Sequence, residues 1–199
     1  MSRAPAMEPE ARRAAILVAA RGVFARLGYH RAGIADIVDA LGVARGTFYR
    51  YFDSKRAVYQ VVLAEMMDEV VGVVAPIDVT RPIPPQVFDN LDRLVRAITA
   101  EDVCRVLFVE SAGIDDEADE ALRAFYVQAL GRIERALETG QALGVVRPGN
   151  VRLLARCLLG LLKEPVFQAA LEHAELDVQG LIGEILALLR GGLLLDGRP

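Results

Sequence analysis

The segment GIADIVDALGVARGTFYRYF, residues 33–52, constrains the fold of this chain more than any other part of it. Two short stretches with helical spacing of apolar residues flank Gly42, which permits the tight turn of a helix-turn-helix. In the second stretch Phe48 and Phe52 are four residues apart, so they share one face of a helix and can both enter a core. The segment therefore predicts two short helices joined by a tight turn.

The remaining faces of the second predicted helix carry hydrogen-bond donors in excess of what a surface helix needs. Guanidinium and hydroxyl groups suit phosphate oxygens and base edges in the major groove of DNA. The residues on these faces are Arg45, Gly46, Thr47, Tyr49, Arg50 and Tyr51. The alternative is an ordinary amphipathic helix with two exposed tyrosines. The neighbouring residues favour the DNA-binding interpretation.

The flanking segments supply the rest of a compact helical unit. An apolar stripe with helical spacing predicts a first helix over 9–27, with Pro9 in its first turn and Gly28 at its stop. Asp53 or Ser54 can cap a fourth helix from about residue 55. Lys55 then lies in its first turn, where the helix dipole disfavours a cation. A phosphate contact explains Lys55 better, and a solvated lysine is the alternative.

These residues together carry a resemblance to a known family. The positions that carry it are Gly28-Tyr29, Ile34, Ile37, Gly42-Val43, Gly46-Thr47-Phe48-Tyr49, Tyr51-Phe52 and Ser54-Lys55. Over about residues 10–60 the chain resembles the N-terminal DNA-binding domain of TetR-family transcriptional regulators. The resemblance implies that Lys55 contacts a phosphate and that the major groove is approached by Arg45, Gly46, Thr47, Tyr49, Arg50 and Tyr51.

Two positions depart from the family pattern. Gly33 stands where members usually have Thr or Ser, so the hydroxyl that would contact a phosphate is missing from this implied DNA-binding position. Ala44 stands where Ser is common and cannot cap the next helix, which costs about 1 kcal/mol unless another group compensates.

Charge is divided unevenly along the chain. Residues 1–56 contain 10 Lys or Arg and 5 Asp or Glu, whereas residues 57–199 contain 13 and 22, within a net charge of −4. The cationic excess therefore coincides with the proposed DNA reader, as neutralisation of backbone phosphates requires. We therefore expect a DNA-binding domain over 1–55, and the resemblance implies a ligand-binding and dimerisation domain over 56–199.

The second domain is helical in pattern throughout. Proline and glycine punctuation predicts helices near 87–98, 103–112, 121–143, 151–171 and 176–194, after a proline-rich connection over 75–85. The acidic run 115–120 fits the first turn of a helix better than a metal or acid–base site. No alternating strand pattern competes. We expect an all-α fold of roughly nine helices.

The last predicted helix is apolar over much of its circumference, which calls for burial on more than one side. A partner subunit can supply the second surface, and the chain resembles, more loosely, family members that form homodimers through their last two long helices. A two-fold dimer would also read both halves of a palindromic operator. The predicted interface residues are Leu158, Leu162, Ile182, Ile185, Leu186 and Leu189.

Aromatic residues of the second domain are candidates for an effector pocket, although plain core is the alternative for each. They are Phe88, Phe108, Phe125, Tyr126, Phe167 and His173. Pro165, with helical spacing on both sides, predicts either a kink beside this pocket or a break between two helices. An acyl chain or acyl-CoA fits, with Arg147, Arg152 and Arg156 for the phosphates, and a lipophilic cation fits the acidic domain equally well.

Three functions remain open from the sequence. A ligand-responsive regulator is favoured, acting as a repressor released from its operator by a small lipophilic effector. An enzyme is disfavoured, because no nucleophile elbow, glycine-rich phosphate loop or metal-ligand spacing occurs, and His30 and His173 are isolated. A DNA-binding protein without an effector is the third.

Location and cofactors follow from what the sequence lacks. We expect no cofactor or metal, no membrane span and no secretory signal, and therefore a cytoplasmic protein. Cys104 and Cys157 are expected to be small buried hydrophobic residues, with a redox pair as the alternative.

Overall fold

The computed structural model describes residues 8–106, 116–172 and 174–194 of the 199-residue chain. Within these ranges the fold is entirely helical, apart from an isolated bridge between Val146 and Leu194. The helices are α1 (Pro9–Arg31), α2 (Ile34–Leu41), α3 (Arg45–Tyr49), α4 (Lys55–Gly72), α5 (Ile83–Thr99), α6 (Glu101–Cys104), α7 (Asp116–Ala142), α8 (Val151–Leu171) and α9 (Val178–Gly192). The prediction of an all-α fold with about nine helices is confirmed for the described residues.

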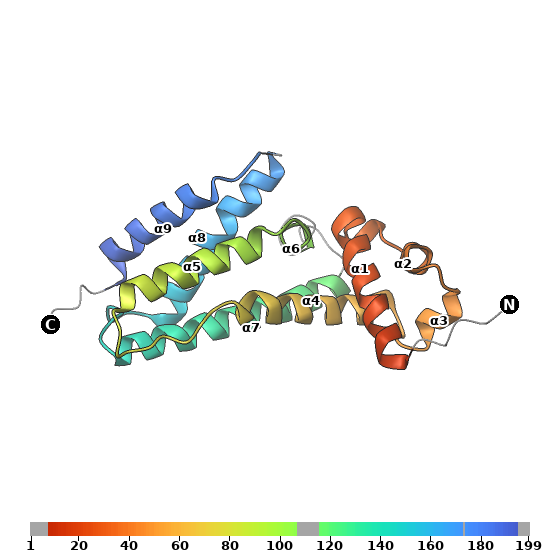
Figure 1. The fold of residues 1–199 in the computed structure, drawn as a ribbon, viewed down its shortest axis with the longest axis horizontal. Coiled ribbons are helices and arrows are strands. Elements are labelled where there is room, and N and C mark those ends of the chain that lie inside the picture. Colours follow the sequence, from red (N-terminus) through yellow and green to blue (C-terminus); the bar gives the residue numbers. More distant parts are fainter. Residues whose placement is uncertain (1–7, 107–115, 173, 195–199) are drawn as a thin grey trace.

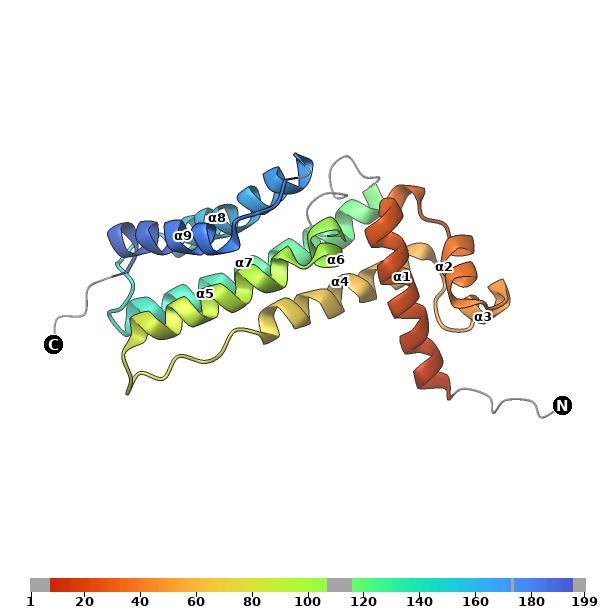
Figure 2. The same ribbon diagram turned by 45° about the horizontal axis from the view of Figure 1, so that its top comes forward.

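The molecule is elongated, with the three N-terminal helices at one end (Figure 1). Helix α4 leaves this end and runs alongside α7 into the bundle that also contains α5, α8 and α9. Helix α6 lies beside α1, where the two parts meet, and the turned view keeps it there (Figure 2). The bundle therefore contacts the N-terminal helices through α4 and α6.

Local sequence signals determine where the N-terminal helices end. Gly28 interrupts α1 with φ 76°, and one more turn continues to Arg31. Gly42 closes α2 in the left-handed region with φ 69°, a conformation that costs glycine little. The Ser54 hydroxyl accepts a hydrogen bond from the Ala57 amide at 3.0 Å and so caps α4. The cap at Ser54 is one of the two predicted, whereas the predicted stop at Gly28 is a kink that α1 passes through before it ends at Arg31.

The boundaries in the second half differ from expectation in several places, and most of the helix predicted over 103–112 lies outside the described residues. Helix α5 begins at Ile83, because Pro84 and Pro85 occupy its first turn rather than the connection before it. Helix α7 begins at Asp116, inside the acidic run. Helix α8 passes through Pro165 as one element, so the alternative of a break at that residue is wrong.

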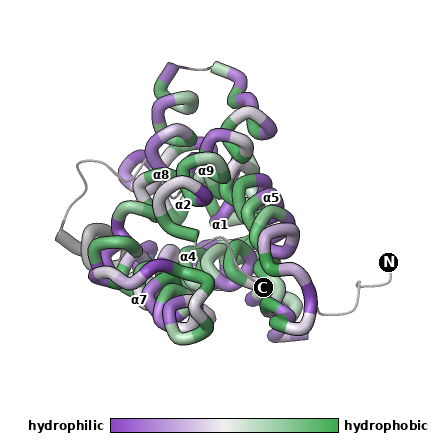
Figure 3. The backbone as a smooth tube through the Cα atoms, turned by 90° about the vertical axis from the view of Figure 1, so that its left-hand side faces the viewer, coloured by the Kyte–Doolittle hydropathy of each residue, from purple (hydrophilic) through white to green (hydrophobic). Residues whose placement is uncertain are grey.

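Two hydrophobic cores hold the molecule together. The first includes the buried faces of α1, α2, α3 and α4, and extends to Ile98 on α5, Val103 on α6 and Val166 on α8. The second lies among α5, α7, α8 and α9. Figure 3 looks along the long axis and shows hydrophobic and hydrophilic residues alternating along the helices, as amphipathic packing requires. Because the first core crosses from the N-terminal helices into the bundle, the two parts share packing.

The exposure of the cysteines differs from expectation. Cys157 is exposed, so the expectation that both cysteines are buried is wrong for this residue; Cys104 is half-buried. Among the helices of the described residues, none combines the length and the apolar character that a membrane crossing requires.

Candidate nucleic-acid interface

Two phenylalanines fix the orientation of α3. Phe48 has no exposed surface, Phe52 is 5% exposed, and their ring centroids lie 5.9 Å apart in the first core. The guanidinium carbon of Arg13 lies 5.2 Å from the Phe52 ring centroid and covers its outer side. Burial of this one face leaves the other faces of α3 turned outward.

The outward faces present the predicted DNA-binding side chains. Arg45, Gly46, Tyr49 and Arg50 are exposed, and Thr47 and Tyr51 are half-buried. Arg45 donates a hydrogen bond from Nη2 to the Tyr49 hydroxyl at 3.3 Å, and its guanidinium lies over the Tyr49 ring. Arg45 and Tyr49 therefore form one paired feature on the surface.

An open groove of about 550 Å³ runs between α3 and the start of α1. Its lining residues are Glu8, Pro9, Arg12, Val43, Ala44, Thr47, Arg50 and Tyr51. Three of the predicted DNA-binding residues thus line one groove together with Arg12, which sequence reasoning missed. The signal was available, because Arg12 and Arg13 stand in the second turn of a helix that follows a proline start.

The two departures from the family pattern have different local outcomes. The Gly33 amide donates to Asp36 Oδ2 at 2.7 Å, so Asp36 supplies a hydrogen bond at the start of α2. No side chain caps α3 at Ala44, whose carbonyl accepts from the Thr47 amide at 2.8 Å. The start of α2 thus has a capping hydrogen bond from Gly33 to Asp36, whereas the start of α3 at Ala44 has no side-chain cap.

Lys55 points at backbone oxygens. Its Nζ donates to the carbonyl of Tyr29 at 2.8 Å and to that of Ala32 at 3.0 Å, and it lies 4.3 Å from the Tyr29 ring centroid. The side chain is half-buried, so it is not the freely solvated lysine considered as an alternative. Lys55 therefore ties the start of α4 to the end of α1.

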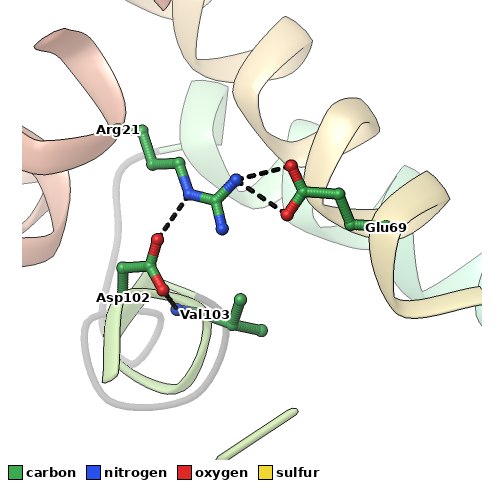
Figure 4. Close-up of polar contacts among 4 residues, drawn as sticks. All are labelled: Arg21, Glu69, Asp102 and Val103. Carbon is green, nitrogen blue, oxygen red and sulfur yellow. Dashed lines mark hydrogen bonds and ion pairs between the residues drawn. The ribbon is translucent and has the colours of Figure 1, made fainter. Parts of the chain in front are cut away.

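A charged cluster links α1, α4 and α6, where the N-terminal helices meet the bundle (Figure 4). Arg21 of α1 donates from Nη1 to both carboxylate oxygens of Glu69 on α4, at 2.7 and 2.8 Å, and from Nε to Asp102 Oδ2 on α6 at 2.5 Å. Asp102 Oδ1 accepts from the Val103 amide. Burial lowers the pKa of Arg21, but hydrogen bonds to the two carboxylates outweigh this and raise it. Nothing in the linear sequence pointed to this cluster.

The predicted effector residues do not all gather. Phe125, Tyr126 and Phe167 are half-buried, and Lys163 Nζ lies 5.6 Å from the Tyr126 ring and 5.8 Å from that of Phe167. Burial raises the pKa of Tyr126 to about 12. Phe88 is 38% exposed, so its assignment to an inward face is wrong. Phe108 and His173 lie outside the described residues.

The predicted dimer residues need a similar correction. Ile182, Ile185, Leu186 and Leu189 are buried in the second core of a single chain, where α9 packs against α5. They cannot also face a partner, because their surface is already covered. Leu158 and Leu162 are half-buried against the same core.

The outer faces of the last two helices carry other apolar side chains. Leu153 on α8 is 55% exposed and Leu188 on α9 is 58% exposed. Arg147 donates from Nε to the Gly192 carbonyl and so holds the end of α9. Arg152 lies 3.9 Å from Glu134, and Arg156 is exposed. Of the three arginines suggested for phosphates, Arg147 thus has a clear structural partner.

The part of the chain that the structure describes contains no candidate metal site. There, no three His, Cys, Asp or Glu side chains gather closely enough to hold an ion.

Comparison with known proteins supports the reading of the N-terminal end. Residues 16–62 match the family model described as bacterial regulatory proteins, tetR family. The HTH-type transcriptional activator FasR of Mycolicibacterium smegmatis is 37% identical over 89 residues, which is 45% of this chain. The match spans 38% of the length of FasR.

Solved structures show the same fold over nearly the whole chain. The fatty acid degradation regulator FadR from Bacillus halodurans is 23% identical, has a TM-score of 0.75 and is aligned over all of both chains. The transcriptional regulator FadR from Bacillus subtilis, in complex with stearoyl-CoA, is 20% identical with a TM-score of 0.75 and covers 90% of this chain and 98% of its own. At these identities the likeness establishes the arrangement of helices.

Proposed function

The chain belongs to the TetR family of DNA-binding transcriptional regulators and is not an enzyme, and from this premise we propose that it is a ligand-responsive repressor. In this proposal residues 1–55 read a palindromic operator in the cytoplasm, and residues 56–199 dimerise and bind a lipophilic effector. Binding of the effector releases the operator.

The outward face of α3 is the observation that carries this proposal. Burial of Phe48 and Phe52 leaves Arg45, Tyr49 and Arg50 exposed on a short helix beside a groove that also contains Arg12. A helix of this size enters the major groove, where an arginine reads guanine and other donors hold phosphates. Gly46, Thr47 and Tyr51 complete the surface that contacts DNA. The Gly33 amide is proposed to lie near the sugar-phosphate backbone of the DNA. Lys55 acts on DNA by holding α1 and α4 in position.

Dimerisation would place two such helices on successive half-sites. We assign the interface to the outer faces of α8 and α9, because each carries a leucine that is more than half exposed, Leu153 and Leu188. An isolated exposed leucine is common, but each of the last two long helices has one, and Cys157, four residues after Leu153 on α8, is exposed as well. We propose that a second copy covers these apolar side chains.

A fatty acyl-CoA is the effector that we propose. A protein of the same fold binds stearoyl-CoA, and a second one is a regulator of fatty acid degradation. In this chain the half-buried Phe125, Tyr126 and Phe167 offer apolar surface next to Lys163, whose ammonium can face a phosphate or thioester oxygen. This lysine favours an anionic ligand over a lipophilic cation.

The shared first core offers a route from effector to operator. Val103 and Val166 pack in the same cluster as Phe48, so a shift of α6 or α8 changes the packing of the N-terminal helices. An effector that binds one arrangement better shifts the population toward it and, by linkage, changes operator affinity.

The test uses the purified chain and a labelled fragment of DNA from upstream of its own coding region. We expect specific binding that weakens steeply as salt rises, and release of the fragment by micromolar stearoyl-CoA but not by free CoA. A reporter driven by the same fragment should become more active when the protein is deleted. A DNA affinity that does not depend on salt concentration or on DNA sequence would refute the proposed recognition of an operator. DNA binding without release by acyl-CoA of any chain length would refute the effector.

A further inference from the structure

A second pocket of about 400 Å³ opens between α1 and α6, away from the face of α3. Its lining consists of Gly22, Ala25 and Arg26 from α1, with Asp102 from α6 and Arg105, which follows α6 directly. Its volume falls in the range of small-molecule sites. The proposed function does not use this pocket.

Arg105 has an unsatisfied donor in this place. Its Nε is buried and has no hydrogen-bond partner among the described residues. A buried guanidinium N–H without an acceptor is costly, because it has lost water and gained nothing in return. Because this atom is enclosed, an acceptor in the pocket can reach it only if the Arg105 side chain turns toward the pocket.

The nearby carboxylates are already engaged. Asp102 accepts from Arg21 through one oxygen and from the Val103 amide through the other, and Glu69 accepts from Arg21 through both oxygens (Figure 4). Arg21 is therefore balanced by two acidic groups. Arg26 and Arg105 then add two positive charges, so cations exceed anions around the pocket.

Gly22 keeps one wall of the pocket open. A Cβ built at this residue meets no atom within 4 Å, so the backbone of α1 has free space beside it. Glycine inside a helix costs stability relative to alanine, and nothing in the packing around Gly22 requires its absence of a side chain.

We propose that this pocket binds a small oxyanion, a carboxylate or a phosphate group, between Arg26 and Arg105. The planar fork of a guanidinium matches both groups and forms short, charge-assisted hydrogen bonds with them. A bound oxyanion gives Arg105 Nε an acceptor once the side chain turns toward the pocket, and it neutralises the cationic excess. It adds a tie between α1 and α6 next to the Arg21 cluster. The proposal is independent of the operator and of acyl-CoA.

Titration calorimetry on the full-length chain tests it, with inorganic phosphate and succinate as separate probes in chloride of matched ionic strength. We expect saturable binding of at least one probe, and a loss of about tenfold or more in affinity in R105Q and R26Q. Phosphate binding alone identifies a phosphorylated ligand, and succinate binding alone identifies a carboxylic acid; either supports the site.

Two variants of Gly22 keep the proposal testable if R105Q fails to fold. Gly22→Met fills the pocket while both arginines remain, and Gly22→Ala adds only a methyl group to open space. We expect Gly22→Met to abolish binding and Gly22→Ala to retain much of it, with unchanged circular dichroism in both. Absence of binding to either probe in the wild-type chain overturns the proposal, as does binding that is equal in wild type, R105Q and Gly22→Met.

Discussion

Lys55 Nζ donates a hydrogen bond to the Tyr29 carbonyl oxygen across 26 positions of sequence, at a distance of 2.8 Å. A second bond to the Ala32 carbonyl makes this lysine a link between the end of α1 and the start of α4. This link adds to the burial of Phe48 and Phe52 in positioning α3, because the chain enters α2 from α1 and leaves α3 toward α4.

Lys55→Met is therefore expected to destabilise the protein. Loss of two charge-assisted hydrogen bonds at a half-buried site corresponds to about 1.5–3 kcal/mol in the free energy of unfolding, measured by urea denaturation. Gln60→Ala, at an exposed position of the same helix, is the control and should change little. An unchanged unfolding free energy together with a smaller salt slope for DNA binding would instead favour direct contact of Lys55 with a phosphate.

Arg45→Ala should act on DNA binding and leave the fold intact. Arg45 is exposed on α3, and the loss of a base contact weakens specific binding by about 1–3 kcal/mol while relaxing preference at one operator position. Fluorescence anisotropy with the operator and with a scrambled duplex separates the two effects. Arg93→Ala, exposed on α5, provides a control. Equal losses for both duplexes would show that Arg45 contacts phosphate.

Leu188→Glu tests the dimer interface on the outer face of α9. A carboxylate at this 58% exposed position leaves the second core untouched but would be buried without a partner in the dimer. We expect a folded monomer by sedimentation velocity, with much weaker operator binding. Val127→Glu on α7, at a position that is 64% exposed, should remain dimeric. Dimers in Leu188→Glu at micromolar concentration would place the interface elsewhere.

The Arg21–Asp102 pair should matter more for operator release by the effector than for the free energy of unfolding. The side chains are 25% and 40% exposed, so screening by water limits their coupling energy to about 1 kcal/mol or less in a double-mutant cycle with Arg21→Gln and Asp102→Asn. Because the pair joins α1 to α6, we expect the same variants to alter the amount of acyl-CoA needed for operator release. A coupling well above that range would show that the pair supports the fold.

The N-terminal half was largely predictable because its signals are local. Phe48 and Phe52 share a face through simple helical spacing, Gly42 supplies the turn and Ser54 supplies the cap, so no distant contact is needed to infer them. Lys55 was different. Its carbonyl partners come from the end of another helix, and their position depends on the extra turn after Gly28.

The helices of the bundle were predictable from the sequence, but the neighbour against which each apolar face packs was not. Ile182, Ile185, Leu186 and Leu189 form one apolar stripe, and spacing alone cannot tell whether such a stripe meets the same chain or a second copy. The Arg21 cluster was also hidden, because Glu69 and Asp102 are 48 and 81 positions away in sequence. Only the packing of α1 against α4 and α6 brings these charges together.

The continuity of the first core has a consequence for biosynthesis. Ile16 and Phe48 leave the ribosome early, but Val103 and Val166, which complete the same cluster, are translated much later. The nascent N-terminal helices therefore carry an incompletely covered apolar surface through most of translation, a state prone to association with other chains. The core that holds the N-terminal helices is therefore complete only after the residues of α8 have been made.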